Sequence, residues 1–292
     1  MSSYRIKPLR ELTIKDNFMF GAVMCDEENC RRLLEMVLQI PILKVEVSKE
    51  KSIVYHPEYK GVRLDVYAKD EHQTHYNVEM QAIKEDALGK RSRYYHSQLD
   101  MELLERGSRY TELPHTYVIF ICDFDPFGAG KYCYIYESIC KESPDSKLLE
   151  ERTSIFLSTK GKNDEEVPQE MVKFLKFVSA GPEESMRDFG DGFVRRLQTA
   201  VHTVKCSREM EGRYMGFQEM LDQQFQAGLT EGRTEGRTEG SSDAIVLLLE
   251  SKGAVSDSLK EQIRSQKDLN TLEGWLKKAI KAQSVEAFME MM

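Results

Sequence analysis

The stretch GVRLDVYAKDEHQTHYNVEMQA, residues 61–82, contains two runs in which apolar and polar side chains alternate. Asp65 stands among the polar positions of the first run, and Glu79 and Gln81 stand among those of the second. Side chains two residues apart on a strand share a face. The pattern therefore predicts two strands in which Glu79 and Gln81 point the same way. If the strands pair, Asp65 can stand beside them.

The polar face of this predicted hairpin needs a partner, because two carboxylates and an amide are costly to bury alone. Two carboxylates suit a hard divalent cation, most naturally Mg²⁺, with water and a substrate phosphate completing the ligand shell. Such an ion orients water and neutralises the charge that builds on a phosphodiester. A structural salt-bridge network explains the same residues; its members would be Arg63, Asp65, Glu79 and Arg91. The residues alone leave both interpretations open.

Composition limits the functions that the chain can have. Its 292 residues are 40% hydrophobic and 31% charged, which is typical of a soluble globular protein. The net charge of −8 provides no general attraction to nucleic acid or to anionic membranes. Phosphate binding therefore needs a local basic patch or bound cations. We find no signal peptide and no apolar run of about 18 residues, so we expect a cytoplasmic protein without membrane contact.

The rest of the pattern predicts a mixed α/β fold. Strands are predicted at residues 45–55, 115–123, 132–136 and 153–157, besides the hairpin. Helices are predicted at residues 27–39 and 86–107, the second with Gly107 as its C-cap, and again from Pro168 onwards. Three strands in a meander, followed by a helix and another strand, imply a mixed sheet with helices on its faces, α/β or α+β.

We expect three parts along the chain: a main domain at 1–205, a linker at 206–240 and a small helical unit at 241–292. The linker contains GLTEGRTEGRTEG, with glycine at every fourth position. Glycine lowers helix stability, which favours a solvated flexible linker or a frayed helix. A stripe of small residues that pairs helices is the alternative. Ser256 and Asp268 are expected to cap helices of the C-terminal unit.

Several side chains near the hairpin permit more than one interpretation. The helix predicted at 86–107 supplies cations for phosphate contacts, namely Lys90, Arg91 and Arg93. Tyr94 and Tyr95 follow these cations and either contact DNA or, as is commoner for such residues, pack in the core. His72 and His75 flank the turn and are expected to be solvated turn residues rather than metal ligands. The DFDPFG segment at 123–128 is typical of a tight turn.

Asp65 followed on the next strand by Glu79-Met80-Gln81 resembles the PD-(D/E)XK nuclease signature, with glutamine in the lysine position. Over nearly its full length the chain resembles the PD-(D/E)XK nuclease family transposases, also called recombination-promoting nucleases. The segments that carry the resemblance are KDNFMFGAVM, VRLDVYAKD, YNVEMQ, KRSRYYHSQLD, FICDFDPFGAGKYCYIYES, IFLSTKGKNDEEV, and a glycine–glutamate repeat before LEGWLKKAIKAQSVEAF.

The resemblance implies a restriction-endonuclease-like core with the order αβββαβ. It also implies a Mg²⁺-dependent DNA endonuclease linked to recombination or mobile elements. Asp65 and Glu79 would hold the metal, or another divalent cation in its place, and Gln81 would take the position of the lysine. A neutral amide can orient water or complete a ligand shell, but it supplies no charge. Arg91 is therefore our candidate for the positive charge.

The resemblance leaves three further points open. Asp16 matches an acidic position near the start of such proteins and either lies near the metal or caps a helix. A nuclease that cuts both strands of DNA would be helped by a homodimer, for which the C-terminal helices are the expected contact. The missing lysine and the acidic net charge favour an alternative function, a catalytically weak nuclease fold that binds DNA or another protein.

Overall fold

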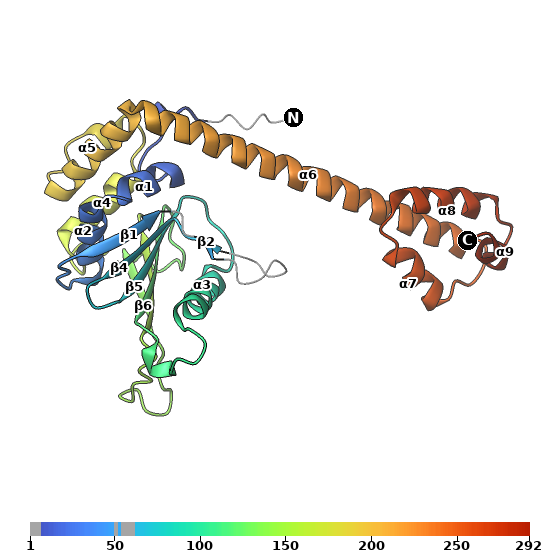
Figure 1. Ribbon diagram of the computed structural model, residues 1–292, viewed down its shortest axis with the longest axis horizontal. Coiled ribbons are helices and arrows are strands. Elements are labelled where there is room, and N and C mark those ends of the chain that lie inside the picture. The colour runs from blue at the N-terminus through green and yellow to red at the C-terminus, as the bar shows by residue number, and fades with distance from the viewer. Residues whose placement is uncertain (1–6, 50–51, 54–61) are drawn as a thin grey trace. The chain divides into compact units, whose positions relative to one another are not determined.

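The computed structural model describes residues 7–49, 52–53 and 62–292 (Figure 1). Two compact units are present, one ending at Tyr214 and the other beginning at Met215. Residues 50, 51, 54 and 55 of the predicted strand at 45–55 lie outside the described residues, as does Gly61 of the predicted hairpin. Among the described residues, no helix combines the length and the apolar character needed to cross a membrane.

A six-stranded mixed sheet forms the centre of the first unit, as the order of predicted elements indicated. The strand order is β1-β4-β5-β6-β8-β7. The bounds are β1 (Val45–Lys49), β4 (Val66–Asp70), β5 (His75–Gln81), β6 (Thr116–Cys122), β7 (Cys133–Tyr136) and β8 (Arg152–Ser158). β1, β4 and β5 form an antiparallel meander; β5, β6 and β8 are parallel, and β7 is antiparallel to β8.

Helices cover both faces of this sheet. Figure 1 shows α3 (Leu88–Leu103) on one face, and on the other α1 (Asn17–Met24), α2 (Glu27–Leu38), α4 (Gln169–Ser179) and α5 (Gly192–Cys206). The core beneath α3 includes Leu88, Tyr95, Leu99, Val118, Phe120 and Phe156. Because α3 covers the polar face of the hairpin, all seven residues of β5 are buried. The predicted α/β class is confirmed.

The first strand of the predicted hairpin is broken at Asp65. Its first part, β3 (Val62–Arg63), pairs with β2 (Ser52–Ile53) in a separate two-stranded sheet. Unbroken alternation predicted that Leu64 lies on the face opposite Tyr67, but both belong to the core beneath α3. A bend at Asp65 separates β3 from β4. Side chains alternate strictly only within a regular strand, so the bend resets the alternation.

Two predictions at turns are corrected by the structure. Gly107 is not the C-cap of α3, because the helix ends four residues earlier at Leu103. Gly107 instead has a φ of 96° in a turn that is closed by a hydrogen bond from the Ser108 N–H to the Glu105 carbonyl oxygen. His75 is not a solvated turn residue, because it begins β5, is 7% exposed and hydrogen-bonds through Nδ1 to the Tyr67 hydroxyl.

The expected turn at 123–128 is confirmed. The Asp125 carboxylate accepts hydrogen bonds from the backbone N–H groups of Phe127, Gly128 and Gly130. The Tyr134 hydroxyl donates a fourth bond to the same carboxylate. This side chain therefore closes the turn in the manner typical of aspartate.

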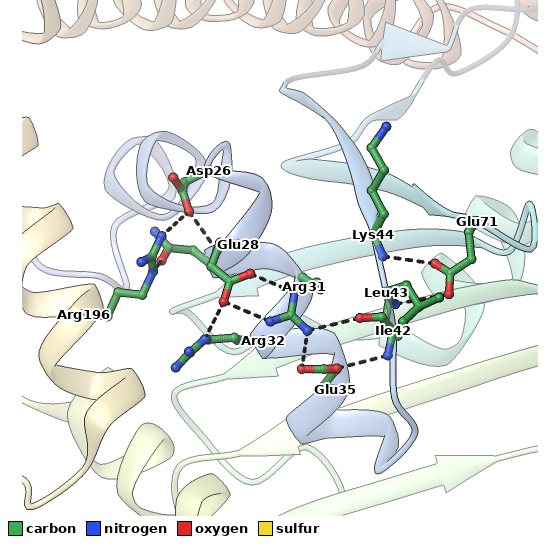
Figure 2. Close-up of polar contacts among 11 residues, drawn as sticks. Asp26, Glu28, Arg31, Arg32, Glu35, Ile42, Leu43, Lys44, Glu71 and Arg196 are labelled. Carbon is green, nitrogen blue, oxygen red and sulfur yellow. Dashed lines mark hydrogen bonds and ion pairs between the residues drawn. The ribbon is translucent and has the colours of Figure 1, made fainter.

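An ion network joins α2 to the start of the sheet (Figure 2). Arg31 pairs with Glu28 and Glu35 and donates a hydrogen bond to the Ile42 carbonyl oxygen. Glu71, in the turn after β4, accepts hydrogen bonds from two backbone N–H groups just before β1. Hydrogen bonds from Arg31 and Arg32 lower the pKa of Glu28 to about 2. This network is structural and partly exposed to water.

The second unit is helical. It contains part of α6 (Arg208–Glu250), and α7 (Asp257–Ser265), α8 (Leu269–Lys281) and α9 (Val285–Met291). Its core includes Ile245, Leu249, Leu259, Ile263, Leu272 and Phe288. Ser256 and Asp268 accept hydrogen bonds from backbone N–H groups at the starts of α7 and α8, so both predicted caps are confirmed.

The glycine repeat forms part of α6 rather than a flexible linker. Residues 221–237 of this helix are all exposed. Glycine lowers helix stability but keeps its backbone N–H, unlike proline, so the repeat weakens the helix without interrupting its hydrogen bonds. The hydroxyls of Thr230, Thr234 and Thr238 each donate to the carbonyl oxygen four residues earlier.

Candidate active site

The register of the antiparallel pair β4–β5 places Asp65 beside Glu79. Val66 is opposite Val78, so the residue before Val66 faces the residue after Val78. The Asp65 N–H donates to Glu79 Oε1 at 3.2 Å, and the Met80 N–H donates to Asp65 Oδ2 at 3.1 Å. The two carboxylates therefore adjoin, as the alternation of the sequence predicted.

Arg91 of α3 contacts the Glu79 member of this pair. Its Nη2 donates to Glu79 Oε2 at 2.9 Å, and its Nη1 donates to Gln81 Oε1 at 2.8 Å. Its Nε donates to the Tyr95 hydroxyl at 2.8 Å, and that hydroxyl donates to Glu79 Oε2 at 3.3 Å. The guanidinium thus binds three groups of one site, and the salt bridge between Arg91 and Glu79 that the sequence allowed is present.

Gln81 is held at both ends of its amide. Its Oε1 accepts the hydrogen bond from Arg91, and its Nε2 donates to the Ile83 carbonyl oxygen at 2.7 Å. Its side chain is buried, with the residue 6% exposed. In this arrangement Gln81 binds a guanidinium, which brings a positive charge next to its amide oxygen.

Burial dominates the electrostatics of Glu79, which is 1% exposed. Burial, followed by the negative charge of half-buried Asp65, raises the pKa of Glu79 to about 7, although Arg91 opposes the shift. Glu28 of the α2 network also pairs with arginines, yet its pKa is lowered. Glu79 differs from Glu28 because its burial outweighs the effect of its arginine partner, and a carboxyl group with such a raised pKa is typical of functional sites.

Comparison with protein families identifies the chain. The family model for the PD-(D/E)XK nuclease family transposases matches residues 15–224. The chain belongs to this family. Its members are nucleases linked to transposition, a role that suggests DNA as substrate, and PD-(D/E)XK nucleases generally use divalent metal ions. Comparisons with curated proteins and with solved structures returned no match.

The residues of this PD-(D/E)XK site fit a divalent cation. Asp65 and Glu79 offer carboxylate oxygens, the ligands that Mg²⁺ prefers. The two carboxylates adjoin in a largely buried place, where burial and then the charge of Asp65 raise the pKa of Glu79. A bound cation would offset both effects. Within the described residues, no three His, Cys, Asp or Glu side chains form a metal-binding group. The donor set therefore suits an ion that keeps several waters, as Mg²⁺ does.

Other residues that the sequence singled out lie around α3. Lys90 and Arg93 are exposed on this helix, where a ligand can reach them. Tyr94 is half-buried and packs against the core beneath α3. Tyr95 is buried in that core, as expected, but its hydroxyl also binds Arg91 and Glu79. The spacing of four residues from Arg91 on a helix is the signal that could have revealed this contact.

The sequence suggested that Asp16 either lies near the metal or caps a helix. It occupies the N-cap position of α1, but its side chain makes no capping hydrogen bond. Its carboxylate instead accepts hydrogen bonds from the Thr13 N–H at 2.7 Å and from Lys7 Nζ at 3.0 Å. The short Thr13–Asp16 turn competes for the oxygen that a cap would use.

Asn77 is a further polar residue on the face of Glu79 and Gln81, two positions before Glu79 on β5. It is fully buried, and within the described part of the chain its amide makes no hydrogen bond of normal geometry, although it lies close enough to Glu79 to lower the pKa of that carboxyl group. Sequence alternation placed it on this face but provided no sign that the amide would lack such bonds. Such a group is unusual in a protein interior.

Proposed function

We propose that this chain is a Mg²⁺-dependent endonuclease that hydrolyses phosphodiester bonds of DNA. The adjoining carboxylates of Asp65 and Glu79 carry the proposal. The Asp65 N–H donates to the Glu79 carboxylate, and the Met80 N–H donates to the Asp65 carboxylate. The family supports a nuclease, and two adjoining carboxylates, one of them 1% exposed, support a site for a cation. We also propose that the chain is cytoplasmic and that its substrate is DNA in the same compartment.

The chain's own residues have distinct proposed roles. Asp65 and Glu79 would hold the cation. When bound, such an ion lowers the pKa of a water ligand and stabilises negative charge on the phosphate. Arg91 supplies a fixed positive charge, since hydrogen bonds to Glu79, Gln81 and Tyr95 hold its guanidinium in place. Gln81 is then a positioning residue that acts through Arg91.

The exposed residues of α3 complete the proposed DNA contact. Lys90 and Arg93 lie on the same helix as Arg91, and their ammonium and guanidinium groups suit backbone phosphates. Tyr94 is half-buried, so part of its ring is accessible for contact with the nucleic acid. We assign this activity to residues 1–205, with 206–240 as a connection to the helical unit at 241–292.

Cleavage of supercoiled plasmid DNA tests the proposed function. We expect the wild-type chain to nick the plasmid in Mg²⁺ but not in Ca²⁺ or EDTA, and Asp65→Ala to be inactive in all three. Equal cleavage by the variant would show that the assignment of the site is wrong. Absence of cleavage by both proteins, with retained DNA binding, would support the second candidate function.

That second candidate is a catalytically weak nuclease fold that binds DNA or a protein. It is favoured by one observation: both carboxylate oxygens of Glu79 already accept hydrogen bonds, Oε1 from the Asp65 N–H and Oε2 from Arg91. A cation can enter only if these contacts adjust. The plasmid assay separates the two functions, because a binding module retains the plasmid without changing its topology.

We also propose that the chain forms a homodimer through its C-terminal helices, with the exposed part of α6 before residue 241 included in the contact. Leu221, Phe225 and Leu229 recur every fourth residue on α6 and are 45%, 59% and 56% exposed. Four-residue spacing gathers them on one side of the helix. Light scattering should show a dimer that Phe225→Glu converts to a monomer, whereas Leu247→Glu, at a 73% exposed position of the same helix, should remain dimeric. A wild-type monomer would contradict the proposal.

A further inference from the structure

A second charged cluster lies at the carboxyl end of β6. Asp123, the residue after the strand, accepts hydrogen bonds from Lys15 Nζ and from Lys160 Nζ, each at 3.0 Å. The Thr159 hydroxyl donates to the same carboxylate at 2.8 Å. Within the described residues, Asp123 is the one carboxylate in ion-pair distance of either lysine. Two ammonium groups thus meet one carboxylate, and the cluster has a surplus of one positive charge.

The cluster adjoins the proposed active site. The Asp123 N–H donates to the Gln81 carbonyl oxygen at 3.0 Å, and the Thr159 N–H donates to the Cys122 carbonyl oxygen at 3.0 Å. β5, β6 and β8 are parallel, so their carboxyl ends lie at one edge of the sheet. Ligands of such sheets bind outside this edge. Lys160 follows β8, so one strand, β6, separates it from the site that contains Gln81 and Glu79.

Three separate parts of the chain build the cluster. Lys15 precedes α1 and also donates to the Ser179 carbonyl oxygen, at the end of α4, at 3.3 Å. Lys160 follows β8. The side chains of Lys15 and Lys160 are 25% and 52% exposed, so both are partly open to solvent. Their hydrogen bonds lower the pKa of Asp123, which keeps this carboxylate charged and the two lysines in place.

We propose that Lys15 and Lys160 form a phosphate-binding subsite for the DNA backbone beside the Asp65–Glu79 pair. The inference rests on the proposed function. A chain with a net charge of −8 has no general attraction for DNA, so binding depends on places with a local surplus of cations. Asp123 holds the two ammonium groups together before the phosphate arrives, which reduces the entropy lost on binding. The subsite recognises phosphate and reads no base sequence.

The chain provides a matched control for this cluster. Lys131 pairs with Glu166 at 2.6 Å, and their side chains are 42% and 60% exposed. One ammonium group meets one carboxylate, so this pair has no surplus charge. A lysine that serves only as a surface ion pair should behave like Lys131.

Fluorescence anisotropy of a labelled DNA duplex in EDTA, measured over a range of NaCl concentrations, tests the subsite. For the full-length Lys15→Gln/Lys160→Gln chain we expect Kd to rise about tenfold, and the slope of log K against log salt to fall by about 1 to 2. Lys160→Gln alone should lower the slope by about 1, and Lys160→Arg should retain the wild-type slope. Lys131→Gln should change neither quantity.

The single variant guards against misfolding of the double variant, because the Lys160 side chain is 52% exposed and has no bond to α4. A Kd and salt slope that match those of the Lys131→Gln control would overturn the subsite. If those same variants still nick plasmid in Mg²⁺, the proposed function stands and the subsite alone is wrong. A wild-type chain that neither binds the duplex nor nicks plasmid would overturn both.

Discussion

Glu79→Gln is expected to lower the rate of plasmid cleavage in Mg²⁺ by about a thousandfold or more. A bound cation stabilises the transition state by several kcal/mol, and each 1.4 kcal/mol or so corresponds to a factor of about ten. Glutamine keeps the shape of Glu79, but its amide has one oxygen, so it can accept the hydrogen bond from Arg91 or the one from Asp65 and not both. The loss would therefore report the missing charge together with one lost hydrogen bond at an otherwise similar side chain.

Glu85→Gln is the matched control for this variant. Glu85 also binds Arg91, at 3.1 Å, but its side chain is 55% exposed. We expect it to retain cleavage within about a few-fold of wild type, because exposed ion pairs contribute little. If Glu79→Gln and Glu85→Gln cleave equally well, Glu79 has no place in the chemistry.

The same variant has a predicted effect on stability that depends on pH. The pKa of Glu79 is raised from 4.5 to about 7, so the folded chain binds this proton more tightly than the unfolded chain. The stabilising contribution is complete below pH 4.5 and is lost as pH rises through about 7. Urea unfolding without metal should show that Glu79→Gln gains stability over wild type as pH rises from 5 to 8. An unchanged difference would contradict the raised pKa.

Arg91→Met is the second substitution with a large expected effect. It leaves Glu79, 1% exposed, without its counter-charge and removes a partner from Gln81 and Tyr95. Breaking a buried ion pair costs about 3–5 kcal/mol. Because the Arg91 side chain is 31% exposed, we expect about 2–3 kcal/mol at pH 8, measured by urea unfolding. Cleavage should fall by about a hundredfold, since a fixed cation near the phosphate is lost.

A double-mutant cycle makes this prediction specific. In a Glu79→Gln background no buried charge remains unpaired, so Arg91→Met should cost much less stability there. The cost should also shrink below about pH 7, where Glu79 can take up a proton. Arg93→Met, an exposed position on the same helix, should leave stability within about 0.5 kcal/mol of wild type. Additive costs in the cycle would show that Arg91 stabilises the fold without acting on Glu79.

Local periodicity predicted most of the elements. The spacing of apolar residues predicted α2, and the short β-branched run predicted β6; both lie within about two residues of the expected bounds. The caps at Ser256 and Asp268 were predictable because the signal and its hydrogen bond lie within one turn. The bend at Asp65 was not predictable, because β3 pairs with β2 rather than with β5. The helical glycine repeat was not predictable from the low helix propensity of glycine, because the propensities of single residues decide only weakly whether a segment is helical.

For the candidate site, the sequence by itself determined that Glu79 and Gln81 share a face, since alternation is a property of the strand backbone. It also supplied the family signature. Only the tertiary structure decided that Arg91, among the three cations predicted on α3, meets both residues. Only the tertiary structure revealed the hydrogen bond between Lys15 and Asp123, which lie 108 positions apart in the sequence. Contacts of this kind depend on how helices pack on the sheet, and no local pattern of residues encodes that packing.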